Sequence, residues 1–208
     1  MKKTRALIVD DQKISRQLFE NFVRSSDKYE LIRSIDTAKM VDIYMARYSV
    51  DLIIMDIVMG DGSNGLDACE YVKNNYPDVK LIAVTSMAEA SFIERSKAIG
   101  VESFWYKEAS REPLLDIMER TIAGESVYPD SAPVIKIGLT DSSDFSNAEM
   151  AVLRELTTGA ENTEIAARLQ ISVNTVKSHI RHMLDKTGFQ NRTELAIEAR
   201  LKGIVVPL

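Results

Sequence analysis

The stretch Asp51-Leu52-Ile53-Ile54-Met55-Asp56-Ile57-Val58-Met59-Gly60 decides the fold of the first half of this chain. Its four consecutive apolar residues, Leu52 to Met55, lack polar alternation, which indicates a strand buried on both faces. Such strands are typical of a parallel sheet covered by helices. The run ends in a carboxylate, Asp56, which is followed by a loop rich in Gly, Asp, Ser and Asn. Because ligands of open α/β sheets bind at the carboxyl ends of strands, Asp56 is a candidate site residue.

Strand-like and helix-like segments alternate between Ala6 and about Gly124. Short apolar runs predict the strands, and apolar residues at helical spacing predict the helices. The predicted strands are 7–9, 31–35, 52–55, 80–84 and 104–106, and the predicted helices are 12–25, a segment through 40–48, 66–75, 90–99 and one starting near 113. Five such units predict an α/β fold with a doubly wound, five-stranded parallel sheet.

Polar side chains follow four of the predicted strands at the point where each strand ends. They are Asp10 and Asp11 after the first strand, Asp56 after the third, Thr85 after the fourth and Lys107 after the fifth. Carboxylates gathered at one sheet edge repel one another, by up to a few kcal/mol per close pair at an effective dielectric of about 20. A fold tolerates such a cluster with a cation or with raised pKa values, and oxygen-only ligands suit Mg²⁺.

These residue types at one sheet edge predict a phosphoryl-transfer site. Asp56 is the expected nucleophile, and Asp10 and Asp11 are the expected metal ligands. Lys107 and the hydroxyl of Thr85 are expected to hold the phosphoryl oxygens. For Asp56 taken alone, the alternative is a carboxylate that only caps the next turn. Four predicted strands end in residues suited to binding a metal or a phosphoryl group, which favours the phosphoryl-transfer site.

The constellation resembles the receiver domain of bacterial two-component response regulators, over residues 1–124. The resemblance implies that Asp11, Asp56 and the backbone carbonyl of Val58 ligate Mg²⁺, with Asp10 acting partly through water.

The resemblance also assigns a switch. Phe104, three residues before Lys107, matches the aromatic residue that turns inward in this family when Thr85 engages the phosphate. Two apolar side chains, Val58 and Met87, are expected to overhang the path of a hydrolysing water, which implies slow self-dephosphorylation.

The chain departs from the receiver pattern near the nucleophile. The family usually has Met-Pro where this chain has Met59-Gly60, and the loop that follows is one residue longer. Lys107 is followed by Glu108 in place of the common Pro. None of these changes removes a reacting group.

Residues 125–144, rich in Pro, Gly and Ser, predict an interdomain linker. From 145 to 208 the pattern is all-α, with four short helices. Ser146 followed by Glu149 is a capping box that opens the first of them, and Ser172 is the expected N-cap of the third. The second and third helices and their tight turn predict a helix-turn-helix whose second helix enters the major groove of DNA.

The third helix of this domain has two faces. Val176, Ile180 and Met183 lie on the apolar face. The candidate DNA-binding residues are Asn174, Thr175, Lys177, Ser178, His179 and Arg181. An ordinary solvated face is the alternative on charge alone. Metal binding by His179 and His182 is disfavoured because no Cys accompanies them.

The stretch from Glu161 to His179 resembles the LuxR-type DNA-binding signature, which Asn191-Arg192-Thr193-Glu194 continues. A receiver followed by this domain is similar to the NarL/FixJ class of response regulators. The resemblance implies a transcription factor, not an enzyme, which a sensor histidine kinase phosphorylates on Asp56. It also implies a homodimer on a double-stranded DNA operator. The fourth helix, with Leu195, Ala199 and Leu201, is the expected dimer surface.

Composition agrees with a soluble, cytoplasmic protein without a membrane partner. The 208 residues carry a net charge of −5, so any contact with DNA must be local. The single cysteine, Cys69, fits a reducing setting, and the apolar run at 6–9 is too short for a signal peptide. Two alternatives remain, a phosphatase of the haloacid dehalogenase type and a DNA-binding regulator that works without phosphate. The adjacent pair Asp10-Asp11 argues against the first, and the complete polar set argues against the second.

Overall fold

The computed structural model describes residues 2–110 and 112–206, which divide into two compact units. The first lies within Met1–Ser86 and Ser91–Ser131, and the second within Met87–Ala90 and Ala132–Leu208. Within the described ranges, no helix is long and apolar enough to span a membrane.

The first unit is built on a parallel five-stranded sheet. Its strands are β1 (Thr4–Val9), β2 (Tyr29–Ile35), β3 (Leu52–Asp56), β4 (Lys80–Thr85) and β5 (Ser103–Tyr106). They are arranged in the order β2-β1-β3-β4-β5, and all neighbouring pairs are parallel. The predicted α/β fold is therefore confirmed.

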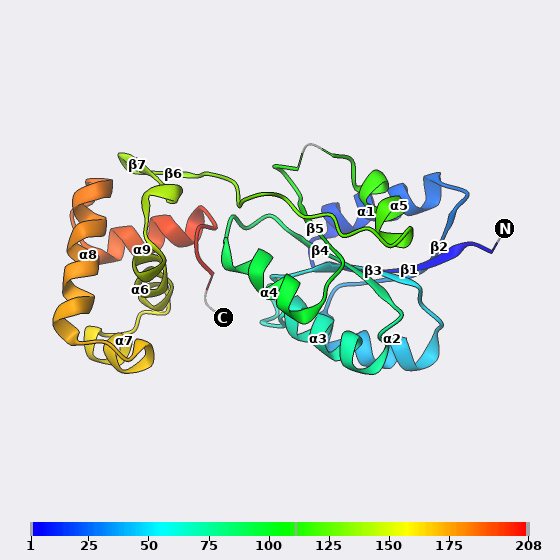
Figure 1. Cartoon of the computed structure of the whole chain (residues 1–208), viewed down its shortest axis with the longest axis horizontal. Helices are drawn as coiled ribbons and strands as arrows, with labels where there is room; N and C mark the ends of the chain where they lie inside the picture. Colours follow the sequence, from blue (N-terminus) through cyan, green and yellow to red (C-terminus); the bar gives the residue numbers. More distant parts are fainter. Residues whose placement is uncertain (1, 111, 207–208) are drawn as a thin grey trace. The chain divides into compact units, whose positions relative to one another are not determined.

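Helices cover both faces of this sheet (Figure 1). One face carries α1 (Lys13–Ser25) and α5 (Leu114–Ile122), and the other carries η1 (Ala38–Met40), α2 (Val41–Arg47), α3 (Gly65–Asn75) and α4 (Ser91–Ile99). The segment predicted as one helix through 40–48 begins with a short 3₁₀ turn, in which the Thr37 side chain accepts a hydrogen bond from Lys39 N at 3.2 Å. Pro113 is the N-cap of α5, so this helix starts near 113 as predicted.

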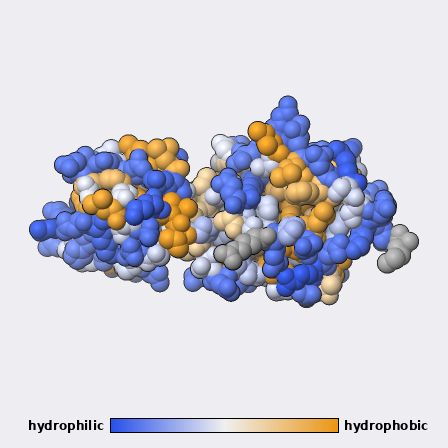
Figure 2. All heavy atoms as spheres, turned by 90° about the horizontal axis from the view of Figure 1, so that it is seen from above, coloured by the Kyte–Doolittle hydropathy of each residue, from blue (hydrophilic) through white to orange (hydrophobic). Residues whose placement is uncertain are grey.

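The central strand β3 is buried as its sequence predicts. Its four apolar residues from Leu52 to Met55 have no exposed surface, and the apolar residues 6–9 of β1 have none either. On the surface of the first unit, Figure 2 shows apolar side chains among hydrophilic ones on the side of α1 and α5. Helix α1 contributes Ile14 and Leu18, whose exposed fractions are 83% and 44%.

Among residues 132–206, the second unit is helical apart from a small hairpin. Its elements are β6 (Lys136–Ile137), β7 (Thr140–Asp141), η2 (Ser142–Asp144), α6 (Asn147–Thr157), α7 (Asn162–Leu169), α8 (Val173–Thr187) and α9 (Arg192–Leu201). The capping box of α6 forms, since Ser146 N donates to Glu149 Oε2 at 2.8 Å and Glu149 N donates to Ser146 Oγ at 3.2 Å. The α7–α8 turn passes through Gln170, whose φ of 55° is left-handed.

The core of the second unit uses residues from outside its four helices. Ile137 of the hairpin and Phe145 before α6 are buried together with residues of all four helices. Leu195 and Ala199 also belong to this core and have no exposed surface. The expectation that these two side chains form a dimer surface on the fourth helix is therefore wrong. The exposed apolar residues of α9 are Ile197 and Leu201, at 53% and 78%.

Candidate phosphoryl-transfer site

The carboxyl ends of β1, β3 and β5 bring two carboxylates and one ammonium into contact. Lys107 Nζ lies 2.7 Å from Asp10 Oδ2 and 2.7 Å from Asp56 Oδ2. Both carboxylates are buried, with exposed fractions of 0% and 2%. The strand order places β1 and β4 on either side of β3, so Asp56 stands at the centre of this edge.

Burial is the main influence on the charges of this site. Burial, opposed by Lys107 and assisted by the charge of Asp10, raises the pKa of Asp56 to about 7. Burial likewise raises the pKa of Asp10, again opposed by Lys107. For Lys107, burial acts to lower the pKa, but Asp56 and Asp10 raise it above its ordinary value. The ammonium therefore stays charged, and the two acids share it.

The third carboxylate completes a group that fits a divalent cation. Asp10, Asp11 and Asp56 each offer one oxygen, and these oxygens lie within 4.8 Å of one another. Asp11 Oδ2 accepts a hydrogen bond from Gly60 N at 2.6 Å, whereas its Oδ1 is buried and has no hydrogen-bond partner among the described residues. Buried oxygen atoms without a donor are the ligands that a hard cation such as Mg²⁺ needs, so the residues fit the metal.

The loop after Asp56 is held close to the nucleophile. Val58 N lies 3.4 Å from Asp56 Oδ1, and Val58 pairs with Asn64 as an antiparallel bridge. Gly65 lies directly against the backbone of the nucleophile, since a Cβ there would stand 1.9 Å from the carbonyl oxygen of Asp56. No sequence pattern marks Gly65 as a site residue, because a close approach between two segments leaves no local pattern.

The two expected switch residues lie on neighbouring strands. Thr85 ends β4, is fully buried, and accepts a hydrogen bond at its carbonyl oxygen from Lys107 N at 2.9 Å. Phe104 is buried in β5, where its ring makes an edge contact with Tyr106 at 4.9 Å and stacks with Tyr128 at 6.2 Å between centroids. Tyr128, from the predicted linker, also donates its hydroxyl to the carbonyl oxygen of Val101 at 2.6 Å.

In the second unit, α8 presents the two faces that its sequence predicts. Val176, Ile180 and Met183 are buried in the core. Among the candidate DNA-binding residues, Asn174, Lys177, Ser178 and Arg181 are exposed, whereas Thr175 and His179 are half-buried. The side chain of Ser172 caps the helix by accepting a hydrogen bond from Thr175 N at 3.0 Å, and its Oγ lies 2.8 Å from Thr175 Oγ1.

Two family models match this chain. The response regulator receiver domain matches residues 6–119, and the luxR family of bacterial regulatory proteins matches residues 143–199. The first match covers more than half of the chain. This chain belongs to the response regulators. The response regulator thus joins a receiver domain to a LuxR-type DNA-binding domain, as in the NarL/FixJ class, and is a transcription regulator and not a classical enzyme.

Relatives of this response regulator match it over most of the 208 residues. The response regulator protein VraR of Staphylococcus aureus (strain NCTC 8325 / PS 47) is 28% identical over 200 residues, which cover 94% of this chain and 95% of VraR. The structure of RcsB from Salmonella enterica serovar Typhimurium, bound to a promoter in the presence of the phosphomimetic BeF₃⁻, has a TM-score of 0.64 at 19% identity. That match covers 97% of this chain and 99% of the RcsB chain, and it shows a shared fold.

Proposed function

We propose that a sensor histidine kinase phosphorylates this response regulator on Asp56, and that the phosphate controls binding of a double-stranded DNA operator by α8. The observation that carries the proposal is the position of Lys107 Nζ, 2.7 Å from both Asp10 and Asp56 in a buried site. A cation so placed lies beside both the nucleophile and a metal ligand, where charge on a transferred phosphoryl group would develop.

Each residue of the site has a distinct role in this proposal. An oxygen of Asp56 attacks the phosphorus atom of the kinase phosphohistidine, the P–N bond breaks, and the imidazole leaves with the electron pair. Lys107 and the Thr85 hydroxyl bind the phosphoryl oxygens. Asp11, Asp56 and the Val58 carbonyl would hold Mg²⁺, with Asp10 acting partly through water. When bound, this ion supplies positive charge that neutralises the carboxylates and the phosphoryl oxygens.

The kinase needs a surface beside the nucleophile. Helix α1 begins at Lys13, two residues after Asp11, and its first turn carries Ile14 with 83% of its surface exposed. An exposed apolar side chain at the rim of the site, followed one turn later by Leu18, provides a contact for a helical partner. A cytoplasmic location stays a prediction.

The response in the DNA-binding domain is proposed to follow from a shift between two conformations. Phosphate on Asp56 favours the conformation in which Thr85 and Phe104 have rearranged, and this conformation forms the homodimer. The exposed Ile197 and Leu201 of α9 supply the apolar dimer surface. RcsB, which shares the fold, has been determined as dimers bound to DNA, which supports the same arrangement for this chain.

The test is labelling with acetyl phosphate and Mg²⁺, followed by intact-mass measurement. Wild type should gain one phosphoryl group, and Asp56→Asn should gain none. Asp67→Asn, which changes an exposed carboxylate in α3, is the matched control and should be labelled as wild type. Equal labelling of Asp56→Asn would refute the assignment of the nucleophile.

A further inference from the structure

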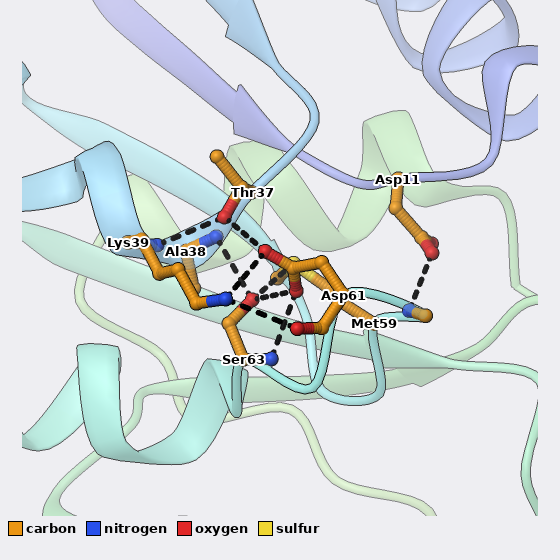
Figure 3. Close-up of polar contacts among 8 residues, drawn as sticks. Asp11, Thr37, Ala38, Lys39, Met59, Asp61 and Ser63 are labelled. Carbon is orange, nitrogen blue, oxygen red and sulfur yellow. Dashed lines mark hydrogen bonds and ion pairs between the residues drawn. The ribbon is translucent and has the colours of Figure 1, made fainter.

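The loop after Val58 is tied to a segment that lies more than twenty residues earlier in the chain. Thr37, Lys39, Asp61 and Ser63 form the set of contacts that we call the loop clamp (Figure 3). Thr37 Oγ1 donates to Asp61 Oδ2 at 2.7 Å. Lys39 Nζ donates to the carbonyl oxygen of Asp61 at 3.0 Å and lies 3.3 Å from Asp61 Oδ2. Side chains of η1 and its N-cap residue Thr37 thus hold the tip of the β3–α3 loop.

Asp61 is the centre of the loop clamp. Its Oδ1 accepts from Ser63 N at 2.8 Å and from Ser63 Oγ at 2.6 Å. Ser63 Oγ in turn accepts from Ala38 N at 3.3 Å. These bonds, first from the Ser63 side chain and then from Thr37, hold the pKa of Asp61 well below its usual range. The carboxylate is therefore ionised and accepts from donors on both segments at once.

Gly60 connects the loop clamp to the site of phosphoryl transfer. It directly precedes Asp61, and its N–H donates to Asp11 Oδ2 at 2.6 Å (Figure 3). A Cβ at Gly60 would lie only 3.1 Å from the same oxygen. The loop therefore approaches Asp11 closely and fixes one carboxylate oxygen, while Oδ1 has no partner among the described residues.

We propose that the loop clamp positions Asp11 for Mg²⁺ and thereby sets the affinity of the receiver domain for the ion. The inference rests on the proposed function, since it concerns the same site. Thr37, Lys39, Asp61 and Ser63 are positioning residues, because they act through the Gly60 N–H and touch no reacting atom. Hydrogen bonds that orient a metal ligand change affinity by about 10–100-fold when they are lost.

The location of the loop clamp separates this role from a structural one. Asp61 and Lys39 are exposed, and Thr37 and Ser63 are half-buried, so none of the four belongs to the core. Polar contacts at a surface contribute little to global stability. Loss of the clamp should therefore weaken Mg²⁺ binding while the thermal midpoint of unfolding changes little.

The experiment compares Thr37→Val and Asp61→Ala with wild type and with Thr37→Ser, which keeps the hydroxyl. Mg²⁺ affinity is measured by calorimetry, and the rate of labelling by acetyl phosphate is measured across Mg²⁺ concentrations. Thr37→Val and Asp61→Ala should bind Mg²⁺ about 10-fold more weakly. They should label slowly at low Mg²⁺ and as fast as wild type at saturating Mg²⁺. Thr37→Ser, which keeps the hydroxyl, should retain wild-type affinity for Mg²⁺.

Several results would overturn the inference. Unchanged Mg²⁺ affinity in Thr37→Val and Asp61→Ala would do so, as would a rate deficit that persists at saturating Mg²⁺. Weaker binding accompanied by a loss of helical circular dichroism would assign the cluster a structural role only. If wild type is labelled on Asp56 and the clamp variants match it in Mg²⁺ affinity and labelling rate, only this inference is contradicted. Wild type that is not labelled on Asp56 contradicts the proposed function as well.

Discussion

At the scale of single residues, the candidate phosphoryl-transfer site holds more buried carboxylates than ammonium groups. Asp10 and Asp56 share Lys107, and the Oδ1 atom of Asp11 has no partner among the described residues. Burying a charge costs free energy unless the charge is paired. The folded protein is therefore less stable with these carboxylates than it would be with apolar side chains in their place. Under the proposed function, these charges serve to bind a cation and a phosphoryl group.

Asp51 shows the opposite case, a carboxylate whose two oxygens are both paired with an arginine. Asp51 accepts from Arg5 Nε at 2.8 Å, from Arg5 Nη2 at 2.7 Å and from Arg5 N at 2.9 Å. The Arg5 side chain is the main reason that the pKa of Asp51 falls from 3.8 to about 2. Because the folded protein favours the ionised form, this stabilisation is complete above about pH 4 and is lost as the pH falls towards 2.

Asp51→Asn should therefore lower the free energy of unfolding at pH 7 by about 1 kcal/mol. The shift in pKa corresponds to about 2.5 kcal/mol, and solvent screening of the partly exposed side chain reduces this figure. Denaturant unfolding at pH 7 and at pH 2.5 checks the prediction, with Asp67→Asn as the control. A difference of the same size at both pH values would be evidence against the ion pair as its source.

The lifetime of the phosphate is also a property of single side chains. Val58 and Met87 are both half-buried, and neither offers a strong hydrogen bond that would orient a hydrolysing water. We expect slow self-dephosphorylation, which Val58→Asn/Met87→Glu should accelerate by at least about 10-fold, since a positioned acid or base typically contributes about 10²–10⁴-fold. Decay of the intact-mass signal after removal of the donor measures the rate. Val58→Leu/Met87→Leu should decay as wild type, and equal decay in the polar variant would exclude shielding.

At the scale of elements, α8 shows how a helix acquires a binding face. Val176, Ile180 and Met183 anchor one side in the core, and the cap from Ser172 fixes where the helix starts. The opposite side then presents Lys177 and Arg181, four residues apart.

Alanine at Lys177 and Arg181 together should weaken operator binding. Loss of a base contact costs about 1–3 kcal/mol of binding free energy, whereas loss of a phosphate contact reduces the salt slope of binding by about one unit. Titration of operator DNA at several salt concentrations separates the two contributions. Lys202→Ala, an exposed basic residue after α9, serves as the control for charge alone. Unchanged affinity and salt slope in the double variant would show that a different face docks.

The segment between the domains contributes to both of them at this scale. Val127 O accepts from Phe104 N at 2.9 Å, so the start of the predicted linker packs beside β5. Its far end supplies Ile137 to the core of the second unit. The division into residues 1–124, 125–144 and 145–208 stays a prediction.

At the scale of the whole molecule, function requires two chemistries in one chain. The receiver and the LuxR-type unit each have their own hydrophobic core. The residues proposed for phosphoryl transfer and those proposed for DNA recognition lie in different units. A phosphate can alter DNA binding only by favouring one conformation or assembly over another. The proposed assembly is a dimer that reads two half-sites about one turn of DNA apart.

Ile197→Asp/Leu201→Asp should therefore separate dimer binding from single-site binding. The charges leave the core untouched because both side chains are exposed, but they disrupt an apolar contact between copies. Affinity of the phosphorylated protein for a two-half-site operator should fall by about 100-fold, the scale of a lost second attachment. Binding to one isolated half-site should not change. Equal losses on both DNAs, or sedimentation showing an intact dimer, would place the dimer surface elsewhere.

The sequence by itself determined the two folds, the strand ends that carry the site and the caps of the DNA-binding helices. These features follow from local rules, because burial on both faces leaves an unbroken apolar run and a cap needs specific residues at fixed spacing. Asp56 and Lys107 were found in this way, as was the polar face of α8.

Only the tertiary structure decided how these pieces meet. Three features depend on distances between segments far apart in sequence. Asp10 and Asp56 share one ammonium, the Gly60 N–H holds Asp11, and the loop clamp ties Thr37 and Lys39 to the β3–α3 loop. The burial of Leu195 and Ala199 was decided in the same way. An apolar residue on a helix gives the same sequence pattern whether the core of its own domain or a second copy of the chain covers it. Only packing, which places neighbours around each side chain, distinguishes the two.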